Sequence, residues 1–386
     1  MNDAYINREL EGTLLDAARY FPVLCVTGPR QSGKSTLVKH LFPDYKPFSL
    51  EDIDMRVAAT EDPRGFLNQT SEGMIIDEVQ HVPELLSYIQ GIVDTHPERR
   101  FVLSGSSNFS LLRGVSQSLA GRAGFFELLP MAYSEMRESL SEQSLNEILF
   151  NGLYPAICAK KNTAQFFYPS YVKTYLERDV RDLLQVKILM QFNTFLRLCA
   201  GRIGSLFNAS ELANEVGVSS NTITSWLSIL QTSYIVYLLP PFFTNSRKRL
   251  VKSPKLYLCD TGLACYLLDI ESPKQLAHDK MRGHLFENFV IIEALKHRFN
   301  LGKESNLFFY RDSNKNEIDL LMLTGQRADG YEIKSASTYH QDFKAKLINL
   351  EKYTNRDVGE RAVIYDGEME TDQSEIKLYN WRHFLP

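Results

Sequence analysis

The sequence predicts an α/β fold whose first part is a parallel sheet with helices on both faces. Three observations indicate this. Short apolar runs alternate with helical patterns over residues 1–135, which is the alternation of strand and crossover helix. A glycine-rich loop at residues 28–35 stands between one such run and one such helix. Another apolar run, residues 73–79, contains two adjacent acids near its end, where a parallel sheet presents functional groups.

Length and composition indicate a globular protein of several domains. The chain has 386 residues, and a prior of roughly 150 residues per domain suggests about two to four domains. Hydrophobic residues make up 44% and charged residues 23%, as in ordinary globular proteins. The net charge of -4 excludes a bulk polycation, so any binding of nucleic acid requires a local basic patch.

Cysteine usage and the N-terminus predict a cytoplasmic protein with no membrane partner. None of the five cysteines forms a CxxC pair or lies at zinc-ligand spacing from a histidine, so we expect reduced thiols in the core. The first ten residues contain no apolar signal core. The longest apolar run, residues 234–243, is too short to span a bilayer and contains two prolines.

Four segments of the chain differ in pattern. Residues 1–135 contain the strands of the predicted parallel sheet, and residues 136–205 read as a helical lid or linker. Residues 206–272 contain two short helices with a tight turn between them, then two strands around a basic stretch. Residues 273–386 read as helix, three strands, helix and strand. The strands predicted in the first segment are 22–28, 46–50, 73–79, 100–107 and 124–130.

The loop at residues 28–35 fits the pattern G-x-x-x-x-G-K-[ST] in full. Its glycines let successive N–H groups turn inward around phosphate oxygens, and the following helix adds its positive end. Lys34 can reach the β- and γ-phosphates as a catalytic residue, Ser35 can coordinate Mg²⁺, and Thr36 can donate to the α-phosphate. We therefore predict that ATP and Mg²⁺ bind here. The predicted nucleotide-binding residues are Gly28, Pro29, Arg30, Gln31, Ser32, Gly33, Lys34, Ser35 and Thr36.

Two acids at the end of an apolar strand are the predicted catalytic partners of the loop. Asp77 is expected to hold Mg²⁺ with Ser35, and Glu78 to polarise the attacking water as general base. Ser106 could sense the γ-phosphate or orient water, and a satisfied turn serine is the alternative. Arg122 could be an arginine finger or sensor that stabilises transition-state charge, or it could form a surface ion pair.

These motifs resemble those of a known ATPase family. The strings GPRQSGKST, SLED, IIDEVQHVPEL, LSGSSNFSLL and SLAGRA are similar to those of the AAA-type ATPases of bacteria and archaea that carry a C-terminal domain of unknown function. The resemblance runs over nearly the whole chain and is specific in the first 135 residues. It implies a strand order 5-1-4-3-2, a winged helix over residues 206–272 and a nuclease-like tail over residues 273–386. AAA-type relatives suggest a homo-hexamer, and a monomer or dimer stays open.

The segment 206–272 matches a helix-turn-helix, in which the second helix enters the DNA major groove. Trp226, Leu227 and Leu230 would face the core. Polar residues of the second helix could face DNA, and the basic stretch would touch phosphates as a wing. A structural lid or protein-contact role stays open, because the second helix contains no arginine or lysine. The polar residues are Ser219, Ser220, Asn221, Thr222, Thr224 and Ser225, and the basic residues are Arg247, Lys248, Arg249, Lys252 and Lys255.

Four residues of the last segment form a second chemical signal. Glu332 and Lys334 alternate on one strand and share a face, where Asp319 of the neighbouring strand can meet them. Glu287, on the preceding helix, could complete the set. Asp319 and Glu332 could bind Mg²⁺ and activate water for attack on a phosphodiester, with Lys334 positioning the water or stabilising charge.

The order of these residues resembles the PD-(D/E)xK nuclease fold, an α/β restriction-endonuclease-like domain, although no proline precedes Asp319. The resemblance implies metal-dependent cleavage, and the alternative is a degenerate fold that binds partners or DNA. Two functions stay open. The first is an ATP-driven machine coupled to DNA, whose tail cuts or grips it. The second is an ATP-switched regulatory protein whose C-terminal parts bind partners without cleavage.

Overall fold

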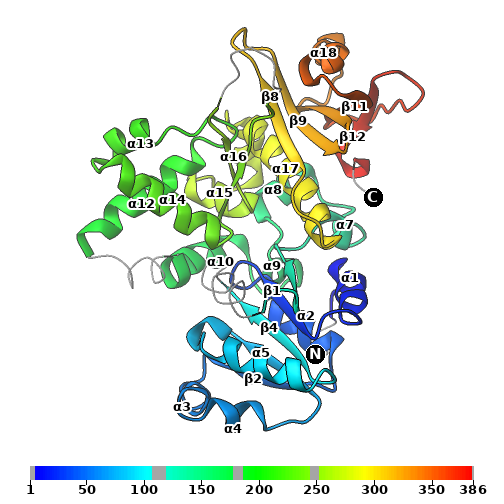
Figure 1. Cartoon of the computed structure of the whole chain (residues 1–386). Helices are drawn as coiled ribbons and strands as arrows, with labels where there is room; N and C mark the ends of the chain where they lie inside the picture. The colour runs from blue at the N-terminus through cyan, green and yellow to red at the C-terminus, as the bar shows by residue number, and fades with distance from the viewer. Residues whose placement is uncertain (1–4, 107–118, 177–185, 244–251, 385–386) are drawn as a thin grey trace. The chain divides into compact units, whose positions relative to one another are not determined.

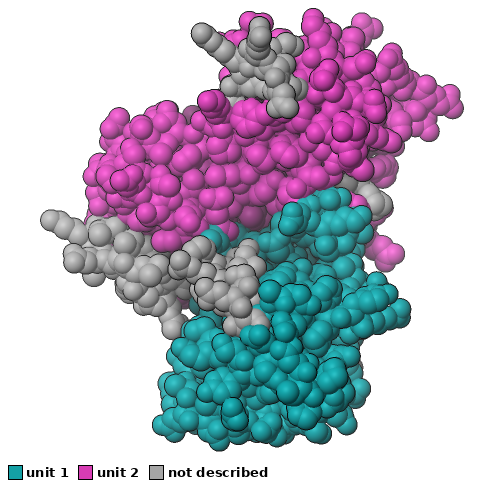
Figure 2. All heavy atoms as spheres, in the orientation of Figure 1, with its two compact units in different colours: residues 1–131, 232–234, 298–304 teal, residues 132–231, 235–297, 305–386 magenta. Residues whose placement is uncertain are grey.

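The chain divides into two compact units (Figure 2). Unit 1 contains residues 1–131 with the short stretches 232–234 and 298–304, and unit 2 contains the remaining residues. Unit 1 thus holds most of residues 1–135, and unit 2 holds most of residues 136–386; the division of unit 2 into three segments stays a prediction. The computed structural model describes residues 5–106, 119–176, 186–243 and 252–384.

Unit 1 is built on a five-stranded sheet whose strands run parallel. The order across the sheet is β2-β3-β4-β1-β5, which from the other edge is 5-1-4-3-2, so the order implied by the resemblance is confirmed. The first four strands lie within their predicted ranges. The strands are β1 (Val23–Thr27), β2 (Lys46–Ser49), β3 (Gly73–Asp77), β4 (Arg100–Gly105) and β5 (Ala123–Glu127).

Helices cover both faces of this sheet, because side chains alternate between the faces along each strand. Val23 and Cys25 of β1 pack into a core with α3, α4 and α5, whereas Leu24 and Val26 pack into a second core with α1 and α2. Figure 1 shows these helices around the strands of the sheet. The sheet is therefore the middle layer of three. The helices are α1 (Leu10–Ala17), α2 (Lys34–Leu41), α3 (Ile53–Glu61), α4 (Pro63–Leu67) and α5 (Leu85–Thr95).

The first part of unit 2 is helical and ends in a small hairpin. α13 (Ala209–Val216) and α14 (Ser220–Thr232) are separated by a short turn in which Gly217 has a φ of 76°. Two antiparallel strands follow, β6 (Val236–Leu239) and β7 (Lys255–Leu258). The preceding helices are α7 (Tyr133–Met136), α8 (Leu145–Asn151), α9 (Pro155–Cys158), α10 (Ala164–Tyr171) and α12 (Val186–Ala200).

The second part of unit 2 is another five-stranded sheet, with the order β12-β11-β10-β9-β8. β9 pairs antiparallel with β8 and β10, and β11 pairs parallel with β10 and β12. Leu320 of β9 lies opposite Tyr331 of β10, so Asp319 and Glu332, the next pair along, are neighbours. The elements are α15 (Thr261–Leu267), α16 (Pro273–His278), α17 (Arg282–Asn300), β8 (Leu307–Arg311), β9 (Glu317–Thr324), β10 (Arg327–Lys334), α18 (Leu350–Thr354), β11 (Asp357–Tyr365) and β12 (Lys377–Asn380).

Two composition-based expectations can be compared with the structure. None of the five cysteines forms a disulfide bond; four are buried, and Cys158 is partly exposed. In the part of the chain that the structure describes, no helix combines the length and the apolar character needed to cross a membrane. The predicted wing residues Arg247, Lys248 and Arg249 lie outside the described residues.

Candidate functional site

The loop of residues 28–33 joins the C-terminal end of β1 to the first turn of α2. Gly28 has a φ of 156°, and a Cβ atom at this position would lie 2.1 Å from the carbonyl oxygen of Leu128. Gly33 has a φ of 93° at the N-cap of α2, a conformation that residues with a Cβ atom avoid. The backbone therefore requires both motif glycines, and the loop has the strand–loop–helix context that the sequence predicts.

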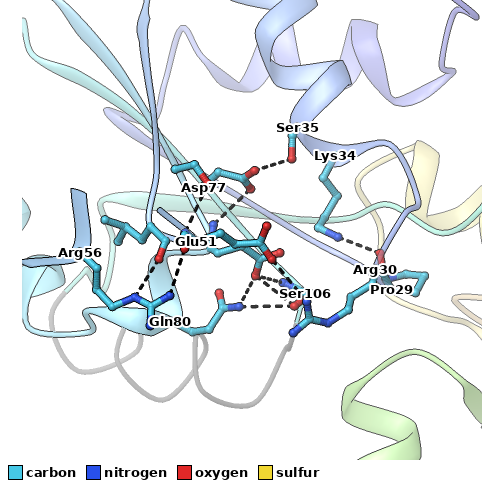
Figure 3. A network of polar contacts seen from close by, with 12 residues as sticks. Pro29, Arg30, Lys34, Ser35, Glu51, Arg56, Asp77, Gln80 and Ser106 are labelled. Atoms are coloured by element: carbon cyan, nitrogen blue, oxygen red, sulfur yellow. Dashed lines mark hydrogen bonds and ion pairs between the residues drawn. The ribbon is translucent and has the colours of Figure 1, made fainter. Parts of the chain in front are cut away.

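Lys34 is folded back onto the loop that precedes it (Figure 3). Its Nζ donates to the carbonyl oxygens of Gly28 at 2.9 Å and Pro29 at 2.8 Å. Burial lowers the pKa of Lys34 to about 8, against the charges of Glu78 and Asp77, which raise it. Because both acceptors are neutral carbonyls, an anionic ligand would stabilise this buried ammonium group better than the loop does.

Asp77, the last residue of β3, connects the loop to the sheet. Its Oδ2 accepts a hydrogen bond from Ser35 Oγ at 2.6 Å, and its Oδ1 accepts one from Ser104 Oγ of β4 at 2.6 Å. Hydroxyl and carboxylate oxygens are the ligands that Mg²⁺ prefers, so this donor set fits the metal. The structure brings together the two predicted ligands, Ser35 and Asp77. Ser104 was not among the predicted residues.

Glu78 follows Asp77 in a left-handed backbone conformation with a φ of 53°, which is uncommon outside glycine and is found at functional sites. Its Oε2 accepts hydrogen bonds from the Ser106 hydroxyl at 3.0 Å and the Ser106 N–H at 3.2 Å, and another from Gln80 Nε2. The structure thus places the predicted residue Ser106 against the predicted base. Gln80 was not predicted, because its spacing from Glu78 carries no sequence signal.

The remaining predicted loop residues surround the start of α2. Arg30 lies 3.5 Å from the Glu51 carboxylate, within the SLED string that follows β2. Gln31 adopts a φ of 62°, Ser32 is buried, and Thr36 is exposed in the first turn of α2. All nine predicted loop residues therefore lie in the loop and the first turn of α2, with Arg30 already paired inside the chain.

Three of the four predicted tail residues meet on neighbouring strands of unit 2. Lys334 Nζ lies 2.7 Å from Glu332 Oε2 and 3.2 Å from Asp319 Oδ2, and the Ile333 N–H donates to the same Oδ2 at 2.9 Å. Burial and the neighbouring Asp319 raise the pKa of Glu332 to about 8. Burial also acts to raise the pKa of Asp319, but the ammonium groups of Lys334 and Lys255 outweigh it and hold that pKa below its usual range.

The fourth predicted tail residue, Glu287, has other partners. Its Oε1 accepts hydrogen bonds from Lys255 Nζ at 3.1 Å and from Tyr257 Oη at 2.6 Å. Lys255 is only 2% exposed, so the expectation that it contacts phosphates from a solvent-exposed wing is wrong. Among the described residues, no group of three or more His, Cys, Asp and Glu side chains is arranged to hold a metal ion. The predicted metal ligands Asp319 and Glu332 instead share Lys334.

Comparison with known proteins assigns the domains and the family. Residues 20–137 match the family model of the AAA domain. Residues 142–274 and 282–384 match two models described as domains of unknown function, DUF8612 and DUF4143. The uncharacterized protein Rv2008c of Mycobacterium tuberculosis is 31% identical over 370 residues, which cover 94% of this chain and 80% of that protein. The chain belongs to the Rv2008c family.

More distant similarities extend to other organisms. An uncharacterized protein of Haemophilus influenzae is 22% identical over 309 residues, covering 72% of this chain and 75% of that protein. The solved structure of the Walker-type ATPase PABY2304 of Pyrococcus abyssi is 14% identical, with a TM-score of 0.48, and covers 69% of this chain and 97% of that chain. The AAA-domain match, the parallel sheet and the phosphate-type loop identify unit 1 of this Rv2008c-family protein as a P-loop ATPase domain.

Arg122 lies away from the loop in this member of the Rv2008c family. Its carbonyl oxygen accepts a hydrogen bond at 3.3 Å from the N–H of Val23, the first residue of β1, whereas the loop follows Thr27 at the other end. Its Nη2 donates to Asp94 Oδ2 of α5 at 2.9 Å. The structure thus shows the ion pair that the sequence left open as one alternative, and a sensor role in the same chain stays a prediction. An arginine finger acting on a neighbouring chain stays a prediction.

Arg8, which was not among the predicted residues, contributes to the site from the segment before α1. It is 6% exposed, and its Nη1 donates to the carbonyl oxygen of Ser32 at 2.9 Å. Its Nη2 donates to the carbonyl oxygen of Leu129, just after β5, at 2.8 Å. One guanidinium group thus connects the loop to the chain that leaves the edge strand.

We expect Arg8→Met to destabilise unit 1 of this Rv2008c-family protein. The change leaves two buried carbonyl oxygens without this donor, each costing roughly 1–3 kcal/mol, so the thermal midpoint should fall by roughly 4–24 °C. The matched control is Arg19→Met, because Arg19 is 74% exposed and pairs only loosely with Asp16. Calorimetric unfolding measures the thermal midpoints of both variants. Equal midpoints for Arg8→Met and Arg19→Met would contradict the role given to Arg8.

Proposed function

We propose that this protein binds Mg-ATP at residues 28–36 and hydrolyses it. The main support is the meeting of Ser35 with Asp77 at 2.6 Å beside Glu78, which is held by Ser106 at 3.0 Å. A phosphate loop, a metal-ligand pair and a carboxylate base at one sheet edge are the parts that hydrolysis of a phosphoanhydride requires.

Each residue has a distinct part in the proposed reaction. Lys34 exchanges its contacts with the loop carbonyls for contacts with the β- and γ-phosphates. Ser35 and Asp77 would hold Mg²⁺, which would neutralise charge on the phosphate oxygens. Glu78 accepts a proton from the attacking water. Ser106 holds the Glu78 carboxylate through its N–H and hydroxyl groups and acts as a positioning residue.

We further propose that residues 206–272 form a winged helix that binds DNA. The support is the sequence of α13, a short turn, α14 and an antiparallel strand pair. The two faces of α14 differ as a recognition helix requires, with an apolar face inward and a polar face outward. The buried residues are Ile223, Trp226, Leu227 and Leu230, and the exposed ones include Asn221, Thr224 and Ser225.

For residues 273–386 we propose a PD-(D/E)xK-like fold that takes part in binding nucleic acid. For residues 136–205 we propose a helical linker. α17 precedes a mixed sheet, and Asp319, Glu332 and Lys334 meet on its adjoining strands. These features support the fold rather than a cleavage reaction. The alternative is an ATP-switched regulatory protein whose unit 2 binds protein partners.

ATP turnover of the full-length protein with and without double-stranded DNA tests the proposed coupling. We expect DNA to raise turnover several-fold. Thr224→Asp, which adds a negative charge to the exposed face of α14, should remove most of this stimulation because it repels DNA phosphates. Asn214→Asp, on the exposed side of α13, is the control that should keep it. Turnover that is indifferent to DNA would favour the regulatory alternative.

A further inference from the structure

A lysine from outside the C-terminal sheet lies within the acidic cluster of that sheet. The cluster comprises Glu287 of α17, Glu317 and Asp319 of β9, and Glu332 of β10. Lys255, from β7, is 2% exposed, and its Nζ lies 2.6 Å from Glu317 Oε1 and 3.1 Å from Glu287 Oε1. One ammonium group therefore contacts two carboxylates that come from different elements of the sheet domain.

The position of Lys255 is fixed by its surroundings. The side-chain amide of Asn288 in α17 makes two hydrogen bonds to the backbone of Leu258 in β7. Its Oδ1 accepts from the Leu258 N–H, and its Nδ2 donates to the Leu258 carbonyl oxygen, each at 2.8 Å. Tyr257, two residues along the same face of β7, donates to Glu287 at 2.6 Å. Phe309 of β8 lies with its ring centre 5.5 Å from the Lys255 ammonium. Backbone, amide and aromatic contacts thus hold the side chain in place.

The carboxylates of the cluster already have cations beside them. Glu317 also pairs with Arg311 at 3.4 Å, and Lys334 links Asp319 to Glu332. A divalent ion entering between Glu287 and Glu317 would have to displace the Lys255 ammonium group, whose charge also acts on Asp319. That group would then be left buried beside a second cation, which is strongly unfavourable where water is excluded.

We propose that the Lys255 ammonium group is a built-in counter-ion that takes the place of a divalent metal ion in this cluster, so that the wild-type protein does not cleave phosphodiesters at Asp319. The inference rests on the proposed nuclease-like fold of residues 273–386. It decides between cleavage of nucleic acid and binding without cleavage. It leaves the domain a binding role. It does not depend on ATP hydrolysis by unit 1, which a separate turnover assay reports.

Binding of Mn²⁺ to the full-length protein without nucleotide tests this, with free Mn²⁺ measured by electron paramagnetic resonance. The wild type and the exposed-lysine control Lys280→Met should bind alike. Asp319→Ala should remove no Mn²⁺ site from the wild type, and Lys255→Met should gain one additional Mn²⁺ site. Adding Glu287→Gln to Lys255→Met should remove the new site. A folded Lys255→Met protein with no additional site overturns the proposal.

If Lys255→Met does not fold, DNA cleavage by the wild-type protein tests the proposal instead. Supercoiled plasmid is incubated with Mg²⁺ or Mn²⁺ and with wild-type or Asp319→Ala protein. Equal nicking by the two proteins supports the proposal. Nicking by the wild type that Asp319→Ala lacks overturns it, as does a wild-type Mn²⁺ site that needs Asp319. Failure of DNA to stimulate ATP turnover would instead count against the proposed coupling and leave this result unaffected.

Discussion

Lys34→Ala is expected to abolish ATP turnover and to weaken ATP binding by at least about 100-fold, or about 2.8 kcal/mol at 1.4 kcal/mol per tenfold. The Lys34 ammonium is buried against neutral carbonyls of its own loop, and burial lowers its pKa to about 8. A triphosphate would place opposite charge in direct contact with this group, so removing the group eliminates a charge-assisted interaction with the phosphates. Competition with a fluorescent ATP analogue measures the affinity.

The control for this change is Lys39→Ala, because Lys39 is exposed on the same helix, α2. It should bind ATP as the wild type does. Thermal unfolding of both variants shows whether the loss is local. A folded Lys34→Ala protein with wild-type affinity and turnover would contradict the proposal that residues 28–36 bind ATP.

Glu78→Gln is expected to lower turnover by roughly 100- to 10,000-fold, the range attributed to a general base, while ATP stays bound. The amide keeps the size of the side chain, and its oxygen can still accept from the Ser106 N–H. It cannot take a proton from water. Rapid-quench measurement of hydrolysis, together with retention of radiolabelled ATP on the protein, separates chemistry from binding.

Glu84→Gln is the matched control for this second variant, since Glu84 is exposed just before α5 and makes the same change of charge. Its turnover should equal that of the wild type. If Glu78→Gln hydrolyses ATP at the wild-type rate, the base is another residue. If it fails to bind ATP, Glu78 acts on the loop rather than on water.

The phosphate loop and its two acids could be predicted because their chemistry is local in the sequence. Gly28, Gly33 and Lys34 are fixed relative to one another by a single turn of backbone, and Asp77 and Glu78 are adjacent at the end of one strand. Parallel strands then bring both sets to one edge without further information. The strand order itself was implied by family resemblance rather than by these residues.

The residues that were missed or misplaced depend on contacts between distant parts of the chain. Arg8 and Ser104 reach the site by packing against it, and nothing in their own neighbourhood marks them. Lys255 follows a basic stretch and so looked like a wing residue, but all four residues of β7 are buried. For Arg122 the sequence left a sensor or finger role and a surface ion pair open, and strand direction puts it at the opposite end of β1 from the loop.

Calorimetric titration of the wild-type protein with Mg-ATP tests the central claim most directly. The account predicts one saturable site per chain, absent in Lys34→Ala and markedly weakened when EDTA removes the metal that Ser35 and Asp77 would hold. No saturable heat of binding from well-folded wild-type protein, or equal binding by Lys34→Ala, would contradict it.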